Sequence, residues 1–344
     1  MSDDKALALL YPMVRKQQLP AVWVLDEHGA GVAAGAANAA VTVLSNRFDV
    51  AGEMGDAGWR SRFCDVDFSD LKDGSMDAVF LRLAKEKPLV HHVVNAAARC
   101  LAPGGRLLLS GGKQQGIKTY AKNAASRLAG AAQIEKYGNE YLAVITRGSA
   151  SAGEALDDRD YTQLRIAVEE GELAFWSKPG LYGWDKVDEG SALLAAHLPQ
   201  FTARAERVCD LGCGYGYLSL HAWRQYAPQR LLATDNNAAA LLACGENLRP
   251  LGEHAAVLAS DCADGIDERF DLVLCNPPFH QGFDVERDLT ERFVAAARRL
   301  LQQGGCAAFV TNSFIPIERV AAPWFGRVER VAENGRFKLT RLQP

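Results

Sequence analysis

A glycine-rich turn between an apolar strand and a helix strongly limits how this chain can fold. Residues 207–211, RVCDL, have the pattern of a short buried strand, and residues 212–218, GCGYGYL, form a turn that opens a helix. Glycines at alternate positions let the backbone turn sharply and approach a ligand closely. In open α/β sheets, ligands bind at the carboxyl ends of the strands, where such turns lie. We therefore expect a ligand site at this turn.

The rest of the second half continues the alternation of strands and helices. The sequence predicts strands at 207–211, 230–235, 255–260, 270–275 and 305–311, and helices at 217–226, 238–248 and 287–301. Strands and helices in alternation form a mostly parallel sheet with helices on both faces. The predicted fold class is therefore α/β.

The first half repeats this plan. Apolar runs at 21–25 and 41–45 predict its first strands. The clearest matches between the halves are 76–81 with 269–274 and 101–109 with 301–309. We infer a duplication of one domain, with the copies at 1–155 and 156–344. The small residues of 147–154, RGSASAGE, predict a flexible linker between them.

Charge is unevenly distributed along the chain. The net charge is -4, yet residues 78–147 hold eleven Lys or Arg and only three Asp or Glu. A local basic surface can bind phosphates even when the whole chain is acidic. The alternative is an ordinary solvated face of the domain.

Several features exclude other classes of protein. No run of about 18 apolar residues exists, and the start of the chain lacks the pattern of a signal peptide. We therefore expect a cytoplasmic protein with no membrane partner. The eight cysteines form no Cys-x-x-Cys pair, which favours free thiols and no metal site. No self-complementary apolar patch is visible, and a monomer is expected.

Acidic residues around the glycine turn favour one cofactor. The spacing Gly212-x-Gly214-x-Gly216 differs from the Gly-x-Gly-x-x-Gly of dinucleotide-binding domains, although a glycine turn alone suits either ligand. Asp210 precedes the first glycine, and Asp235 ends the next strand. Asp235 can bind both ribose hydroxyls of an adenosine, and Asp210 can meet the positively charged methionine part of S-adenosylmethionine.

A third carboxylate is a weaker candidate for the same cofactor. Asp261 ends the third predicted strand, where its side chain can reach the adenine amine. Aspartate is also a good helix cap, and this alternative remains open.

The loop after the fourth predicted strand contains the candidate catalytic residues. It reads Asn276-Pro277-Pro278-Phe279, and its prolines stiffen the backbone. An exocyclic amine conjugated to a ring is a poor nucleophile, because its lone pair is delocalised. The side-chain oxygen of Asn276 and the carbonyl oxygen of Pro277 can orient such an amine beside the cofactor, and Phe279 can stack on it. His280 either contacts the substrate or is structural.

These segments resemble a known family. The turn and the loop are similar to class I methyltransferases with an Asn-Pro-Pro-(Phe/Tyr) signature. More specifically, the chain resembles the ribosomal RNA guanine-N2 methyltransferases, with the family of small subunit methyltransferase C first and that of large subunit methyltransferase G next. The residues that carry this resemblance are NPPFHQG at 276–282, PGLY at 179–182, DEGS at 188–191, NSF at 312–314 and GRFK at 335–338.

The resemblance implies two tandem Rossmann-like methyltransferase domains, each with a mostly parallel seven-stranded sheet. It is strong over 175–344 and only architectural over 1–150. It implies transfer of a methyl group from S-adenosylmethionine to the N2 amine of a guanine in ribosomal RNA, most specifically 16S. The partner would be ribosomal RNA or the small ribosomal subunit. Asp210, Gly212, Gly214, Gly216, Asp235, Asp261 and Asn276 would bind the cofactor, and Asn276, Pro277, Pro278 and Phe279 would be catalytic.

The first half departs from this pattern. It has LDEHGAG at 25–31 in place of the glycine turn and LRLAKEK at 81–87 in place of the catalytic loop. We therefore predict that the first domain binds no cofactor and has a structural and RNA-binding role. The candidate RNA-binding residues are Arg82, Lys85, Lys87, Lys113 and Lys118.

Other functions remain open on the residues alone. The same loop serves guanine-N2 methylation of 23S rRNA, adenine-N6 methylation and methylation of a protein glutamine. A non-catalytic RNA-binding assembly factor for the ribosome is an alternative of another class.

Overall fold

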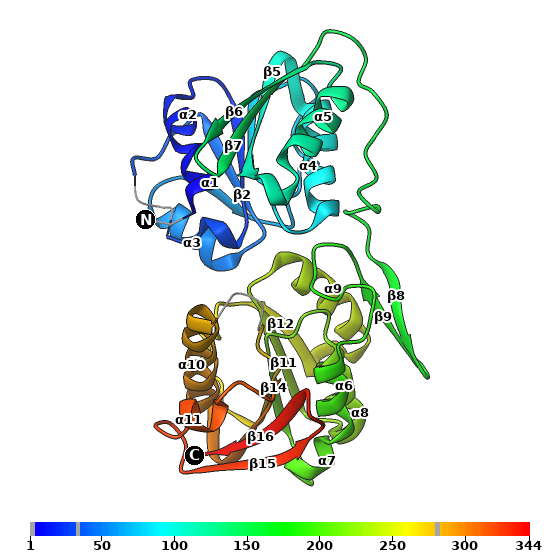
Figure 1. Cartoon of the computed structure of the whole chain (residues 1–344). Coiled ribbons are helices and arrows are strands. Elements are labelled where there is room, and N and C mark those ends of the chain that lie inside the picture. Colours follow the sequence, from blue (N-terminus) through cyan, green and yellow to red (C-terminus); the bar gives the residue numbers. More distant parts are fainter. Residues whose placement is uncertain (1–3, 32–34, 279–282) are drawn as a thin grey trace. The chain divides into compact units, whose positions relative to one another are not determined.

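The computed structural model describes residues 4–31, 35–278 and 283–344, without the side chains of 283–288. It divides into two compact units, Met1–Gln163 and Leu164–Pro344 (Figure 1). None of the helices in these described ranges is long and apolar enough to cross a membrane.

The first unit is built on a seven-stranded sheet with the order β3-β2-β1-β4-β5-β7-β6. Its strands are β1 (Ala21–Leu25), β2 (Val41–Ser45), β3 (Arg60–Phe63), β4 (Met76–Arg82), β5 (Leu101–Gly112), β6 (Ala131–Tyr137) and β7 (Glu140–Thr146). Its helices are α1 (Lys5–Ala8), α2 (Tyr11–Lys16), α3 (Phe48–Asp56), α4 (Lys87–Cys100) and α5 (Ile117–Arg127). The short helical turns η1 (Glu27–Gly29) and η2 (Lys113–Gln115) follow β1 and β5.

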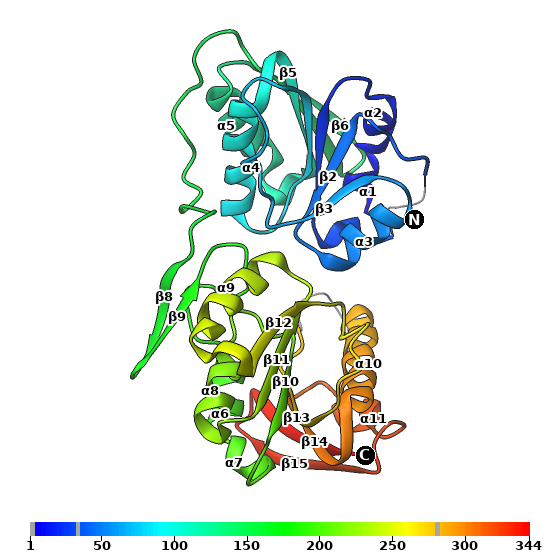
Figure 2. The ribbon, with the colours of Figure 1, turned by 180° about the vertical axis from the view of Figure 1, so that it is seen from behind.

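The second unit has the same plan, with the strand order β12-β11-β10-β13-β14-β16-β15 (Figure 2). Its strands are β10 (Arg207–Leu211), β11 (Arg230–Asp235), β12 (Ala255–Ala259), β13 (Phe270–Cys275), β14 (Leu301–Asn312), β15 (Arg327–Glu333) and β16 (Phe337–Gln343). Its helices are α6 (Glu189–Ala196), α7 (Leu198–Phe201), α8 (Tyr217–Tyr226), α9 (Ala238–Leu248), α10 (Phe283–Leu300) and α11 (Ile317–Ala321). The turn η3 (Arg249–His254) precedes β12, and β8 (Arg165–Glu170) and β9 (Leu173–Ser177) form a separate hairpin.

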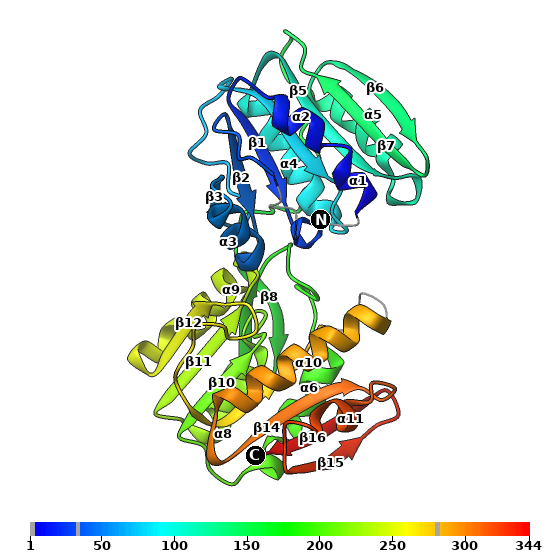
Figure 3. The same cartoon turned by 90° about the vertical axis from the view of Figure 1, so that its left-hand side faces the viewer.

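In each sheet a single strand, β7 or β16, runs antiparallel to both of its neighbours, and the other pairings are parallel. In the second unit, β10 to β14 pair in parallel, and β16 runs antiparallel to both β14 and β15. Successive side chains of β13 point to opposite faces: Leu272 and Leu274 pack with α8 and α9, whereas Val273 and Cys275 pack with α10. Figure 3 shows α10 and α11 together on one face of this sheet. The predicted fold, two mostly parallel seven-stranded sheets with helices on both faces, is confirmed.

The two sheets share an irregularity at the start of their corresponding strands, β5 and β14. A side chain on Gly105 would come within 3.2 Å of the carbonyl oxygens of Asp77 and Met76, and one on Gly305 within 3.0 Å of those of Asp271 and Phe270. Glycine is required at both positions because only it allows this close approach of two backbones. Met76 therefore corresponds to Phe270, one residue later than the sequence match suggests.

The predicted linker belongs to the first unit. Gly153 donates its backbone N–H to the carbonyl of Arg127, and Asn95 exchanges two hydrogen bonds with the backbone of Leu156. Tyr161 is 1% exposed, stacks on His92 and donates to Asp65. In agreement with these contacts, the boundary between the two compact units lies between 163 and 164 rather than between 155 and 156. Composition suggested a flexible segment, but Gly148 and Gly153 donate their backbone N–H groups to the carbonyls of Leu128 and Arg127 in the first unit.

Removing the side chain of Tyr161 should destabilise the first unit. We expect Tyr161→Ala to lower its free energy of unfolding by about 3–5 kcal/mol, because a buried aromatic ring is lost. Tyr161→Phe, which keeps the ring and removes the hydroxyl that donates to Asp65, should cost about 1 kcal/mol. Chemical denaturation measures both. A cost for Tyr161→Ala close to that for Tyr161→Phe would show that the segment adds little to this core.

Candidate active site

The glycine turn and the Asn-Pro-Pro loop lie side by side at the carboxyl edge of the second sheet. β10 and β13 are neighbouring parallel strands, and Leu211 pairs with Cys275. The next residue of each strand begins one of the two segments: Gly212 begins the turn and Asn276 begins the loop. Two segments 64 positions apart in the sequence therefore meet at one place, as the sequence predicted.

The turn requires glycine for two different reasons. Gly212, Gly214 and Gly216 all have positive φ, at +81°, +54° and +87°. At Gly214 a side chain would meet no atom within 4 Å, so this glycine faces open space. At Gly216 a side chain would come within 2.9 Å of Cys244 Sγ, so that glycine also allows α8 to pack against α9. Gly214 has the geometry of a ligand-facing position, and Gly216 has an additional packing role.

Asp210 is a buried carboxylate with one unpartnered oxygen. The residue is 1% exposed, and its Oδ2 accepts a hydrogen bond of 2.6 Å from Ser219. Its Oδ1 is buried and has no partner among the described residues. Burial raises the pKa of Asp210 to about 7, although the hydrogen bonds from Ser219 oppose this shift. A buried carboxylate oxygen without a partner suits a cationic group or a water at the turn.

Asp235, the last residue of β11, is held by the backbone of the turn and by that of Asn237, the N-cap of α9. Its Oδ2 accepts from the N–H of Gly214 at 3.0 Å, and its Oδ1 accepts from the N–H of Asn237 at 2.9 Å. These two bonds hold the carboxylate beside the glycine turn. Binding of the two ribose hydroxyls by Asp235 remains a prediction.

Asp261 has a partner that sequence reasoning missed. Its carboxylate forms an ion pair with Arg292 of α10, and it accepts a longer hydrogen bond, 3.4 Å, from Asn236 Nδ2. A contact between Asp261 and an adenine amine would share the carboxylate with Arg292. The interpretation of Asp261 as an adenine contact remains a prediction.

Asn276 is fixed by two acceptors from α6. Its Nδ2 donates to Asp188 Oδ1 at 2.7 Å and to Ser191 Oγ at 2.8 Å. In the loop that follows, Pro277 is buried and Pro278 is exposed. Phe279 and His280 lie outside the described residues, and the stacking role of Phe279 remains a prediction. The contact between Asn276 and α6 was not foreseen, because 85 or more positions separate the partners in the sequence.

The fold and the site together define an S-adenosylmethionine-dependent methyltransferase of class I. The described residues fit the cofactor: a turn that faces open space, a buried carboxylate oxygen that needs a partner, and a second carboxylate at the end of the neighbouring strand. Residues 172–341 match the family described as "Methyltransferase small domain".

Comparison with curated relatives identifies the family. The chain is 31% identical over 301 residues to ribosomal RNA small subunit methyltransferase C of Shewanella amazonensis, covering 88% of this chain and 86% of that protein. It is 32% identical to the protein of the same name from Shewanella loihica, over 77% of this chain and 76% of that protein. The chain belongs to the ribosomal RNA small subunit methyltransferase C family.

A solved structure covers both units. The 16S rRNA N2 G1207 methyltransferase of T. thermophilus, in complex with AdoMet and guanosine, matches with a TM-score of 0.82 and 26% sequence identity. The match covers 99% of this chain and 92% of that chain. The match therefore extends over the residues of both units.

Strand register shows which site residues the first unit lacks. Asp210 pairs with Leu274, two residues before Asn276, whereas Trp23 pairs with Phe80, two residues before Arg82. Trp23 thus stands at the position of Asp210, and Arg82 at that of Asn276. The pairing of β1 with β2 and of β10 with β11 gives a third correspondence: Ser45, the last residue of β2, stands at the position of Asp235, the last residue of β11.

Arg82 is a correction to the predicted RNA-binding set. It is 9% exposed, and its guanidinium forms an ion pair of 2.9 Å with Asp4 and donates to the carbonyl of Leu83. A buried arginine with these partners cannot contribute to an exposed basic surface. The sequence could not show this, because Asp4 is 78 positions away.

The other four candidate RNA-binding residues are exposed at the edge of the first sheet where its parallel strands end. Lys85 and Lys87 follow β4, and Lys113 and Lys118 follow β5, its parallel neighbour. Lys118 also lies 5.3 Å from the ring centroid of Tyr141. In the part of the chain that the structure describes, none of these lysines forms an ion pair. We call these four lysines the basic edge.

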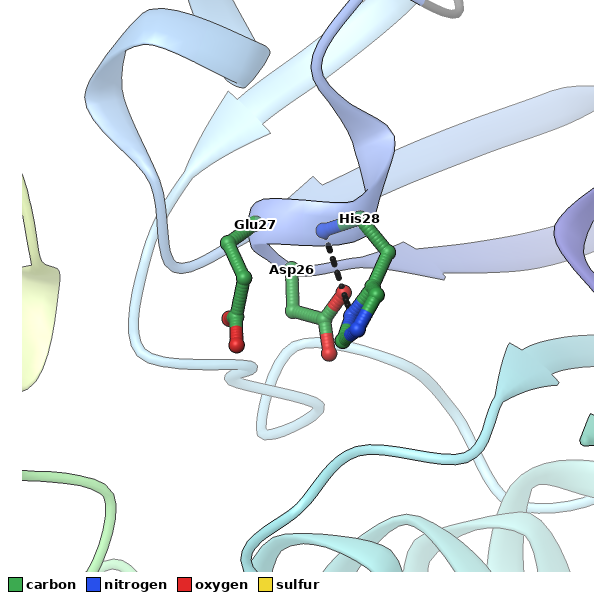
Figure 4. Close-up of side chains that lie close together, drawn as sticks. All are labelled: Asp26, Glu27 and His28. Atoms are coloured by element: carbon green, nitrogen blue, oxygen red, sulfur yellow. Dashed lines mark hydrogen bonds and ion pairs between the residues drawn. The ribbon is translucent and has the colours of Figure 1, made fainter. Parts of the chain in front are cut away.

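The first unit replaces the glycine turn with a cluster of polar side chains (Figure 4). Ligand atoms of Asp26, Glu27 and His28 all lie within 4.8 Å of one another, which is the only metal-compatible group within the described ranges. Asp26 Oδ1 lies 2.8 Å from His28 Nδ1. Burial disfavours the charged imidazole, but the hydrogen bond and the charge of Asp26 outweigh it and raise the pKa of His28. This geometry is that of an ion pair, and we assign no metal to it.

The raised pKa of Asp210 predicts a pH dependence of cofactor binding. The ionised form attracts the cationic cofactor, so affinity should rise as the pH rises from 5.5 to 7, by up to about tenfold per pH unit. The stability of the second unit without cofactor should change with pH in the opposite direction. Because its folded pKa is above the unfolded value, stability should fall as the pH rises from about 4 through about 7.

Titration calorimetry with S-adenosylmethionine at several pH values measures the affinity. Asp210→Asn, which cannot ionise, is the matched control and should bind weakly with a flat profile. A flat profile for the wild-type protein would contradict the assignment of Asp210 to the cofactor site.

Proposed function

We propose that this protein transfers a methyl group from S-adenosylmethionine to the N2 amine of a guanine in 16S rRNA. The observation that carries the proposal is the placement of Asn276 beside the glycine turn, with its amide nitrogen already bonded. The similar T. thermophilus protein, which acts on N2 of a 16S guanine, supports the choice of acceptor. Ribosomal RNA or the small ribosomal subunit is the proposed partner of a monomeric enzyme, and this substrate would place it in the cytoplasm.

Asn276 and Pro277 would orient the acceptor amine. Their oxygens, Oδ1 and the backbone carbonyl, would each accept one hydrogen of the amine. Two acceptors on the two hydrogens favour the pyramidal nitrogen that forms as its lone pair attacks, and they align it with the donor. When bound, the cofactor supplies an electrophilic methyl group. The methylated nitrogen then loses its proton readily, so no strong base is required.

Aromatic stacking would hold the base. Guanine must leave its stack to reach this edge of the sheet, either flipped from a helix or already in a loop. Phe279 follows the two prolines, and we propose that its ring stacks on the guanine. Pro277 is buried and gives the loop a fixed start.

The first unit would bind RNA without a cofactor. Its sheet has Trp23 and Ser45 where the second unit has the two carboxylates of the cofactor site, and Arg82 where it has Asn276. The basic edge combines four exposed ammonium groups with the amino-terminal ends of α4 and α5, whose dipoles also attract phosphate. This combination favours an RNA-binding role over an ordinary solvated face.

The function is tested by Asn276→Ala. Cells that lack this protein should lose one N2-methylguanine from 16S rRNA, detected by mass mapping of RNA fragments, and the wild-type gene should restore it. Asn276→Ala should not restore it, because methyl transfer falls by about 100-fold or more when the amine is misaligned. Methyl groups lost instead from 23S rRNA, from adenine or from protein would refute the proposed substrate.

A binding measurement is the control for this variant. Asn276→Ala should still bind S-adenosylmethionine, because Asp210 and Asp235 are intact. Full methyl transfer by Asn276→Ala would contradict the catalytic role of the loop, whichever substrate is methylated.

Charge reversal tests the basic edge. Lys85→Glu/Lys87→Glu should weaken binding to 16S rRNA and flatten its salt dependence, since each phosphate contact makes the slope of log K against log salt more negative by about 0.7–0.9. The matched control is Arg60→Glu/Lys72→Glu, which reverses two exposed charges at the amino ends of β3 and β4. Equal losses for the two double variants would indicate that only net charge matters.

A further inference from the structure

We propose that Asp188 and Ser191 are positioning residues that hold the side-chain amide of Asn276 with its oxygen directed at the acceptor amine. This inference rests on the proposed function, since it concerns how Asn276 recognises the substrate. It adds two residues that lie outside both the glycine turn and the Asn-Pro-Pro loop.

The orientation of the amide follows from the chemistry of its partners. An ionised carboxylate only accepts hydrogen bonds, so the group of Asn276 that lies 2.7 Å from Asp188 Oδ1 must be its NH2. The reversed amide would bring two oxygens together at that distance. Ser191 Oγ, at 2.8 Å, takes the second hydrogen. Both amide hydrogens are then used, and Oδ1 remains as an acceptor, to which none of the described residues donates.

Asp188 is itself fixed in place. It is the N-cap of α6, and the same Oδ1 accepts from the backbone N–H of Ser191 at 2.8 Å. A side chain on Gly190, between them, would come within 3.2 Å of both Asp188 Oδ1 and the ring of Phe337 on β16. The buried Leu194 anchors the same helix in the core that contains strands β10 and β13. The acceptors of Asn276 are therefore part of the scaffold rather than of a loop.

The charge of Asp188 also strengthens Asn276 as an acceptor. A hydrogen bond from an amide NH2 to a carboxylate polarises the amide and shifts electron density to its oxygen. The attacking amine becomes positive as the methyl group is transferred, so a more negative Oδ1 stabilises the transition state more than the ground state. Asp188 and Ser191 should therefore affect kcat more than substrate or cofactor affinity.

Asp188→Asn separates this role from helix capping. Asparagine caps helices as well as aspartate does, so α6 and the melting temperature should be preserved. The new side chain is neutral and presents either an oxygen or an NH2 to Asn276, so the amide loses both its polarisation and its unique orientation. We expect kcat to fall by about tenfold or more, with KM for S-adenosylmethionine nearly unchanged.

Two further variants keep the test decisive. Glu189→Gln is the matched control: it removes a carboxylate from the next residue, which pairs with Arg336 and not with Asn276, and it should leave kcat unchanged. Ser191→Ala removes one acceptor and leaves Asp188 and the backbone N–H of the cap intact. It should lower kcat less than Asp188→Asn does, and it tests the inference if Asp188→Asn does not fold.

A double-mutant cycle identifies the residue through which Asp188 acts. In an Asn276→Ala background, Asp188→Asn should cause no further loss of kcat, because its target is gone. Additive losses would mean that Asp188 acts elsewhere, and wild-type kcat in both Asp188→Asn and Ser191→Ala would overturn the inference. These outcomes leave the proposed function intact as long as wild-type protein methylates guanine N2 and Asn276→Ala does not. Failure of the wild-type protein to do so would refute the proposed function itself.

Discussion

Parallel pairing of β10 with β13 is the constraint on which the site depends. It places the first residue after each strand at the same edge of the sheet, so that the cofactor turn and the substrate loop face each other. The core supports this pairing from both sides, because alternate residues of β13 are buried against α8 and α9 or against α10. A one-residue slip would exchange the side chains that pack on the two faces and would shift the loop away from the turn.

The two units show how one scaffold can support different roles. Both have the same strand order, the same bend before the fifth parallel strand and the same antiparallel ending. The differences in the site lie at the carboxyl ends of the strands and in the residues that follow them. In the second unit these are glycines and oriented carboxylates, and in the first they are an ion-paired Asp26 and His28 and a buried Arg82. The fold is retained by the core, whereas the site depends on a few strand ends.

Much of this architecture could be predicted from the sequence, because the elements have strong local signals. The observed bounds of β10, β11, β13, α8 and α9 match the predicted ones, since apolar runs and glycine or proline breaks define them locally. The boundary between the units was predicted too early, because the burial of Tyr161 depends on His92 and Asp65, which are far away in the sequence. Amino-acid composition can indicate local flexibility, but it does not show contacts between residues that are distant in the sequence.

The class of the site could be inferred from the residue pattern: the spacing of Asp210, the three glycines and Asp235, followed by Asn276 after the fourth strand. The partners of these side chains became apparent from the packing of the folded chain. Asn276 meets Asp188, Asp261 meets Arg292, and Arg82 meets Asp4. The physical reason is that backbone conformation and strand pattern are set by neighbouring residues. A hydrogen bond between two side chains depends on how helices and loops that are distant in the sequence pack against the sheet.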